Sequence, residues 1–206
     1  MKNIKTIIFD LGGVILNISY QNTIDSFKKL GITNTDDFYS KKTQSHIFNL
    51  IETGKITAKQ FLNDLQELTD NATIPEVRSA WNAMLLDFPE KRLDLLRSLK
   101  SKYQLFLLSN TNAIHINAIN NKLGDTKWKG FINLFDKMYL SHEIGVRKPN
   151  IEAFQFILDE QNLNPKEVLF IDDSQQHIEA AKKLDLNCYH LKDEEDITTL
   201  FPDKVQ

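Results

Sequence analysis

Short apolar runs, each closed by polar residues, dominate the hydrophobic pattern of this chain. Four stand out, and a weaker fifth lies between the second and the third of them: residues 4–10, 103–110, 136–141, 167–173 and 187–193. Short runs that are apolar on both faces are typical of strands in a parallel sheet covered by helices on both sides. The pattern therefore predicts such a sheet.

Amphipathic helical patterns separate these runs. Residues 89–102, 150–162 and 174–185 carry apolar side chains at helical spacing, and Ser174 stands where it would cap the third helix. Strands that alternate with such helices favour βαβ units. We therefore predict an α/β fold with a doubly wound and mostly parallel sheet.

The connection after the first strand is much longer than a simple crossover. It shows no good strand pattern and instead holds four helical patterns: residues 20–31, 43–54, 57–69 and 75–86. Gly31 and Gly54 stand where C-terminal caps are expected, and Thr57 and Thr73 stand near helix starts. Because structureless loops of this length are uncommon in compact domains, we expect an all-helical insertion.

Two domains follow from these patterns. We expect a Rossmann-like catalytic core formed by residues 1–17 and 88–206, and a helical cap domain formed by residues 18–87. The chain has 206 residues, which is enough to bury a proper core and to carry an insertion of this size.

Composition and charge narrow the choice of partners and compartment. The formal net charge of −3 gives no sign of a nucleic-acid or acidic-membrane partner, so we expect neither. The one cysteine cannot form an intrachain disulfide, which favours the cytoplasm. No apolar stretch approaches the length needed to cross a bilayer. The sequence does not determine the oligomeric state, for which we expect a monomer or a weak dimer.

Polar side chains stand where three of the predicted strands end. In a doubly wound sheet, ligands bind beyond these carboxyl ends. The residues there offer carboxylates, a hydroxyl and an amide: Asp10, Ser109, Asn110, Asp172 and Asp173. Lys148, just before the helical pattern at residue 151, adds an ammonium group. The sequence therefore predicts that one crevice collects these groups.

Three carboxylates in one crevice would repel one another unless a cation lies among them. A small set of oxygen ligands suits Mg²⁺, which keeps several waters and shares a phosphate. A hydroxyl and an ammonium group would hold the other phosphate oxygens, and one carboxylate could attack phosphorus to form an aspartyl-phosphate. Asp10 would then be tolerated at the end of a buried strand because Mg²⁺ and Lys148 neutralise it.

The ordered motifs FDLGGV, LLSNTN, RKP and FIDD resemble the four motifs of the haloacid dehalogenase superfamily of hydrolases. The resemblance covers nearly the whole chain, and the helical insertion resembles the cap of that superfamily. The segments ETGKITAKQF and LSHEIGVRKPNIEAF most resemble bacterial phosphatases of the glucose-1-phosphate type. The phosphatase half of two-domain epoxide hydrolases is a related match. The resemblance implies a Mg²⁺-dependent phosphatase that acts on a small phosphorylated metabolite, with sugar phosphates among the candidates.

The resemblance also implies roles around the metal. Asp10 matches the nucleophile, which forms the aspartyl-phosphate. The Mg²⁺ ligands would be Asp10, the backbone carbonyl of Gly12 and Asp172. Asp173 matches an outer-shell acid that orients a metal-bound water.

The phosphate site implied by the resemblance adjoins this metal site. Ser109 matches the hydroxyl that binds a phosphate oxygen, and the amide of Asn110 lies beside it. Lys148 matches the catalytic lysine that bridges the nucleophile and the phosphate.

Gly12 departs from the pattern of most phosphatases in the superfamily, which carry a second aspartate at this position. That aspartate protonates the leaving group and later activates water, and general acid–base catalysis is typically worth ~10²–10⁴ in rate. Sugar-1-phosphate phosphatases of similar sequence also carry glycine there, and a hemiacetal oxygen is a better leaving group than a simple alcohol. We therefore expect sugar 1-phosphates to be preferred over unactivated alkyl phosphates.

Two alternatives stay open at this point. A 2-haloacid dehalogenase also uses an aspartate nucleophile, but such relatives carry an aromatic residue in place of Gly12 and an arginine in the cap. Arg78 is the only arginine of the insertion, and it lies on a polar helical face. A non-catalytic, phosphate-binding descendant would account for the missing acid.

Single residues also admit plain structural interpretations. Ser109 or Asp172 alone could cap the next helix. We interpret Glu52 and Gly54 as a helix end, and His177 as a helix-surface or outer-shell residue. Taken together, however, the motifs favour an enzyme, because helix caps have no reason to supply a lysine and a nucleophile as well.

Overall fold

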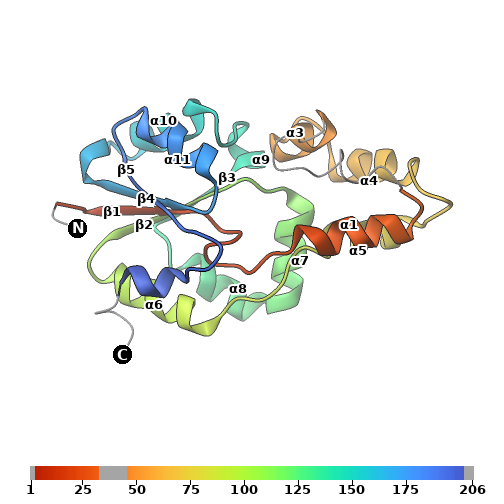
Figure 1. Cartoon of the computed structure of the whole chain (residues 1–206), viewed down its shortest axis with the longest axis horizontal. Coiled ribbons are helices and arrows are strands. Elements are labelled where there is room, and N and C mark those ends of the chain that lie inside the picture. The colour runs from red at the N-terminus through yellow and green to blue at the C-terminus, as the bar shows by residue number, and fades with distance from the viewer. Residues whose placement is uncertain (1–2, 33–45, 202–206) are drawn as a thin grey trace.

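The computed structural model describes residues 3–32 and 46–201 (Figure 1). Its centre is a five-stranded parallel sheet with the strand order β3-β2-β1-β4-β5. The strands are β1 (Thr6–Phe9), β2 (Gln104–Ser109), β3 (Lys137–Leu140), β4 (Val168–Asp172) and β5 (Asn187–His190). All five predicted strands, including the weaker one, are therefore confirmed. The order reverses at β1, which places a ligand crevice beyond the carboxyl ends of β1 and its neighbours.

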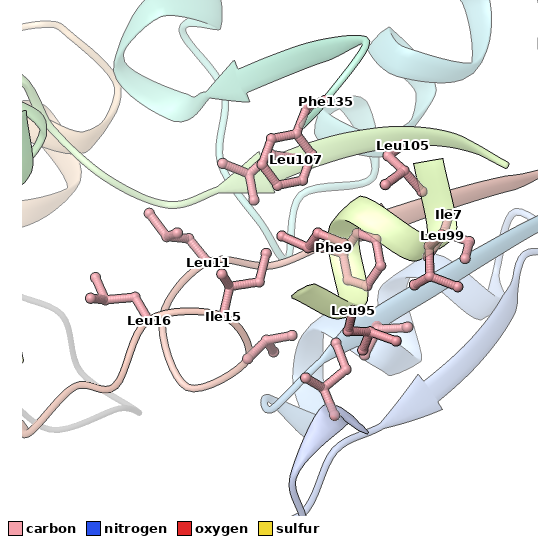
Figure 2. Close-up of a cluster of buried hydrophobic side chains, with 14 of the residues drawn as sticks. Ile7, Phe9, Leu11, Ile15, Leu16, Leu95, Leu99, Leu105, Leu107 and Phe135 are labelled. Carbon is pink, nitrogen blue, oxygen red and sulfur yellow. The ribbon is translucent and has the colours of Figure 1, made fainter. Parts of the chain in front are cut away.

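Burial on both faces of the sheet explains why the strands are apolar throughout. Ile7 and Phe9 of β1 point to one face and Ile8 points to the other, as the two-residue repeat of a strand requires. Figure 2 shows the hydrophobic cluster on the first of these faces, where Ile7 and Phe9 lie together with Leu95 of the covering helix α6. Each face is thus closed from water by helices.

The helices that cover the sheet lie in two layers (Figure 1). One layer contains α6 (Glu90–Lys100), α7 (Ala113–Leu123), α8 (Asp125–Ile132) and the 3₁₀ turn η2 (Ile197–Leu200); the other contains α10 (Ile151–Glu160) and α11 (Gln175–Lys182). The short elements α9 (Ser141–Ile144) and η1 (Pro165–Glu167) complete the core. Ser174 is the residue before α11, but its side chain makes no capping hydrogen bond, contrary to the expectation.

The described helices between β1 and α6 pack around a cluster of their own. They are α1 (Tyr20–Lys29), α3 (His46–Glu52), α4 (Ala58–Gln66) and α5 (Ile74–Asn82). Thr57 and Thr73 cap α4 and α5 as predicted, and Thr73 forms a capping box with Glu76. The start of the predicted helix over 43–54 falls on residues 43–45, which lie outside the described part. Ile114 of α7 joins this cluster, so the helical insertion rests on the core through α7.

Backbone hydrogen bonds join the two segments that lead into and out of this helical region. The Asn17 amide donates to the Asp87 carbonyl at 2.9 Å, and the Leu86 amide donates to the Asn17 carbonyl at 3.0 Å. Ile18 and Leu85 form an antiparallel bridge beside them. The chain therefore leaves and re-enters the core at neighbouring points, and the domain limits at 17/18 and 87/88 stay a prediction. Among the described residues, no helix combines the length and the apolar character that crossing a bilayer requires.

Candidate active site

The predicted site residues gather at the carboxyl ends of three adjacent strands. Asp10 follows β1, Ser109 ends β2 and Asp172 ends β4, and β1 pairs with both of the other strands. Parallel pairing brings strand ends to the same edge of the sheet, which is why residues far apart in the chain meet here. Carboxylate oxygens of Asp10, Asp172 and Asp173 lie within 4.8 Å of one another.

Lys148 forms ion pairs with two of these carboxylates. Its Nζ lies 2.8 Å from Oδ1 of Asp10 and 2.6 Å from Oδ2 of Asp172, and the lysine is 0% exposed. Burial opposes the ammonium charge, but the two carboxylates raise the pKa of Lys148 above its ordinary value. Lys148 therefore stays charged beneath the site, as a cation held between two acids.

Asp172 turns inward, toward the protein. Its Oδ1 accepts from the Ser174 amide at 2.8 Å, and Nδ1 of His177 lies 2.9 Å from Oδ1. The carboxylate is 0% exposed. Burial alone would raise the pKa of Asp172, but Lys148 and His177 lower it to about 2. Both oxygens of Asp172 are thus engaged by protein groups. His177 is buried against this carboxylate rather than lying on the helix surface, and its outer-shell role stays a prediction.

Asp173, by contrast, lines the pocket beside Asp10 and Gly12. The turn after β1 is shaped to receive it. Gly13 has φ +76°, and a Cβ there would clash with Oδ2 of Asp173. Glycine is required at position 13 both for the backbone angle and for this close approach.

Asn110 holds the backbone of Lys148 in place. Its Nδ2 donates to the Lys148 carbonyl at 2.8 Å, and its Oδ1 accepts from the Lys148 amide at 2.9 Å. Ser141 secures the loop after β2 that carries Asn110, because its hydroxyl accepts from the Thr111 amide at 2.9 Å and donates to the Thr111 carbonyl at 3.0 Å. Asn110 lines the pocket as predicted, and it also positions the lysine, which the sequence did not indicate.

The pocket above these groups is closed partly by the helical insertion. Tyr20 of α1, Phe48 and Glu52 of α3, and Arg147 of the loop after α9 line it together with Asp10, Gly12, Ser109 and Asn110. Glu52 ends α3 as predicted, and it also faces Arg147, whose Nε lies 3.2 Å from Oε2 of Glu52. Nothing in the sequence marks these two residues as partners, because they belong to different parts of the fold.

The carboxylate cluster fits a divalent cation. Burial raises the pKa of Asp10, Lys148 opposes this shift, and the negative charge of Asp172 raises it further. The single charge of Lys148 does not balance three neighbouring carboxylates, and a cation that binds oxygen ligands would relieve the remaining repulsion. The groups that reach the pocket side are Asp10, the Gly12 backbone and Asp173.

Comparisons with known proteins identify the family of the chain. Over residues 4–185 the chain matches the haloacid dehalogenase-like hydrolases. It is 34% identical over 182 residues to a D-ribitol-5-phosphate phosphatase of Bacteroides thetaiotaomicron, with 88% of each protein covered.

Solved structures give the same result. An aspartate-to-alanine variant of a haloacid dehalogenase family enzyme from the same species, in complex with magnesium and inorganic phosphate, superposes with a TM-score of 0.90 at 34% identity, over 96% of this chain and 98% of that one. A hydrolase of this kind from Porphyromonas gingivalis gives a TM-score of 0.86 at 28% identity, over 97% of both chains. The predicted fold and the predicted resemblance are therefore confirmed, and the chain belongs to the haloacid dehalogenase-like hydrolase family.

Proposed function

We propose that this protein is a Mg²⁺-dependent phosphatase that transfers the phosphoryl group of a small phosphorylated polyol or sugar to Asp10 and then to water. The observation that carries the proposal is the arrangement around Asp10, which is paired with the buried Lys148 and faces a pocket shared with Ser109. Phosphatase chemistry is favoured over dehalogenation because the similar curated enzyme is a phosphatase and the similar solved enzyme binds magnesium and inorganic phosphate.

The residues of this chain divide the work of the reaction. Ser109 and Asn110 line the pocket, where the Ser109 hydroxyl, with Asn110 beside it, would hold phosphate oxygens in line with the Asp10 carboxylate. Lys148 keeps Asp10 oriented and tempers its charge before attack. A carboxylate oxygen of Asp10 attacks phosphorus, the alcohol leaves, and water then hydrolyses the aspartyl-phosphate. When bound, Mg²⁺ supplies charge neutralisation to the phosphoryl oxygens.

The geometry favours an exchange of the roles first inferred for the two neighbouring acids. Asp172 is fully buried and both of its oxygens are engaged, so it is poorly placed to bind an ion in the pocket. Asp173 lines the pocket beside Asp10. We therefore assign Asp173, with Asp10 and the Gly12 carbonyl, to Mg²⁺, and we assign Asp172 to the positioning of Lys148.

A panel of phosphorylated polyols and sugars, assayed with and without Mg²⁺, tests the proposal. We expect turnover of at least one member that requires Mg²⁺ and that is lost in Asp10→Asn, while that variant remains folded by circular dichroism. The panel includes sugar 1-phosphates, so the preference expected from Gly12 is tested in the same experiment. Turnover by Asp10→Asn at the wild-type rate would contradict the assignment of the nucleophile.

A further inference from the structure

Position 12, two residues after the nucleophile Asp10, cannot donate a proton to the leaving group. Gly12 has no side chain, and a Cβ there would lie 3.1 Å from Cδ1 of Ile18. A side chain at position 12 would therefore press against the Ile18 side chain, and glycine itself offers no acid. If an unactivated alcohol is the leaving group, its proton must come from another part of the pocket.

Glu52 is held at the seam between the helical insertion and the core. It is the last residue of α3, and the chain then turns at Gly54, which has φ +66°. A Cβ at Gly54 would clash with the carbonyl oxygen of His142 in α9, so only glycine lets the end of α3 approach the core this closely. The ion pair of Glu52 with Arg147 adds a second attachment at the same seam.

This position buries the carboxyl group inside the pocket that contains Asp10. The side chains of Glu52 and Arg147 are 14% and 11% exposed. The facing atoms, Oε2 of Glu52 and Nε of Arg147, lie 3.2 Å apart, yet neither has a hydrogen bond of good geometry within the described part of the chain. A buried carboxyl oxygen that lacks a protein hydrogen-bond partner is suited to form a hydrogen bond with a substrate oxygen when the carboxyl group is protonated.

Burial sets the protonation of Glu52 together with the charges of Arg147, Lys148 and Asp10. The titratable and charged groups on the elements that surround it include Asp10, Tyr20, His142, Glu143, Arg147 and Lys148. Burial raises the pKa of Glu52, Arg147 and Lys148 lower it, and Asp10 raises it, with a result of about 7. A group with this pKa is a competent acid and a competent base at neutral pH.

The other titratable side chains of the pocket are less suitable. His115 is kept neutral, because burial lowers its pKa to about 4, and both of its ring nitrogens already contact neighbouring groups. Nδ1 of His177 faces Asp172. Burial raises the pKa of Tyr20, so its phenol is a weaker proton donor than usual. Glu52 is left as the acid best placed to serve the leaving group.

We propose that the Glu52 carboxyl group donates the proton to the leaving oxygen of the substrate, in place of the acid that Gly12 lacks; this inference rests on the proposed phosphatase function. As an Asp10 oxygen bonds to phosphorus, the bond from phosphorus to the substrate oxygen breaks. Its electron pair stays on that oxygen, which receives the Glu52 proton and leaves as a neutral alcohol.

The second half of the reaction restores both groups. The Glu52 carboxylate takes a proton from the water that attacks the aspartyl-phosphate. The new bond from water oxygen to phosphorus replaces the bond to Asp10, whose carboxylate is regenerated. Glu52 is again a carboxylic acid, and inorganic phosphate carries the remaining proton of the water.

Two substrates separate this role from a structural one. We expect Glu52→Gln to lower kcat/KM for an alkyl phosphate, such as D-ribitol 5-phosphate, by about 10²-fold or more. For p-nitrophenyl phosphate, whose leaving group is stable as an anion, the loss should stay below about tenfold. Glu143→Gln removes the same charge from an exposed position on α9 and is the matched control, with both values unchanged.

The pH profile gives an independent readout. For the alkyl phosphate, wild-type kcat should fall above about pH 7, where Glu52 loses its proton, and this fall should be absent in Glu52→Gln. Equal losses on the two substrates, or an unchanged pH profile, would overturn the proposal. If the glutamine variant does not fold, Glu52→Asp takes its place, and the alkyl loss should again exceed the aryl loss.

Failure of the proposed function is distinguishable from failure of this inference. If the wild-type protein shows no turnover of either substrate that depends on Asp10, the phosphatase assignment fails and the role of Glu52 fails with it. If turnover depends on Asp10 but the two substrates respond equally to Glu52→Gln, the phosphatase stands and Glu52 is not its acid.

Discussion

Removal of the Lys148 ammonium group tests how the acidic cluster is tolerated. In Lys148→Met, Asp10 and Asp172 would remain buried without their shared cation, although Nζ now lies 2.8 Å and 2.6 Å from their oxygens. Breaking a buried ion pair by removing one partner typically costs about 3–5 kcal/mol. Because whole domains are stable by roughly 5–15 kcal/mol, this variant should lose a large share of its free energy of unfolding.

The measurement is urea unfolding at pH 7, with EDTA and then with Mg²⁺. We expect the full loss in EDTA. Mg²⁺ should then stabilise the variant as it does the wild type, because an ion that binds only the folded state at 100 times its Kd adds about 2.7 kcal/mol. Adding Asp172→Asn to Lys148→Met should reduce the loss, since one of the unpaired charges disappears.

Lys137→Met is the matched control. Lys137 also pairs with a carboxylate at 2.8 Å, that of Glu160, but these side chains are 46% and 36% exposed. Solvent screens such a pair, so its removal should leave the urea midpoint almost unchanged. Equal losses in the two variants, or a loss below about 1 kcal/mol in Lys148→Met, would refute the view that burial makes Lys148 essential.

Two further predictions follow from single sites. Gly13→Ala should abolish stabilisation by Mg²⁺ in a thermal shift assay, because the new Cβ would displace Asp173. The control Gly145→Ala, at φ +75° with open space around its Cβ, should keep the Mg²⁺ response and lose only some stability. A normal Mg²⁺ response in Gly13→Ala would argue against Asp173 as a ligand. Burial lowers the pKa of His115 from 6.5 to about 4, so the unfolded chain takes up this proton first on acidification. The resulting stability is complete above about pH 6.5 and falls toward pH 4 by at most about 3 kcal/mol, and His115→Gln should show a shallower fall in urea midpoint over this range; an identical slope would exclude His115 as the cause.

Local pattern was sufficient to identify the elements of the sheet and the residues at its active edge. Apolar runs marked each strand, and parallel pairing then required Asp10, Ser109 and Asp172 to share one edge. Thr57 and Thr73 were found as helix caps by the same local logic, since capping depends on only a few neighbouring residues.

Which way each acid faces could not be decided from the sequence. Asp172 and Asp173 are adjacent in a strand end, so they point in opposite directions, and only the tertiary structure shows that Lys148 and His177 take the first while the pocket receives the second. The same holds for Asn110, whose side chain is bound to the Lys148 backbone across 38 positions of sequence.

The sequence by itself determined the α/β core, its helical insertion and the inventory of reactive groups, because these follow from periodicities and strand ends that each segment carries alone. The tertiary structure alone decided that Glu52 of the insertion meets Arg147 of the core above the nucleophile. That contact depends on how two separately packed hydrophobic clusters are docked, and no local pattern of residues encodes the docking of one cluster on another.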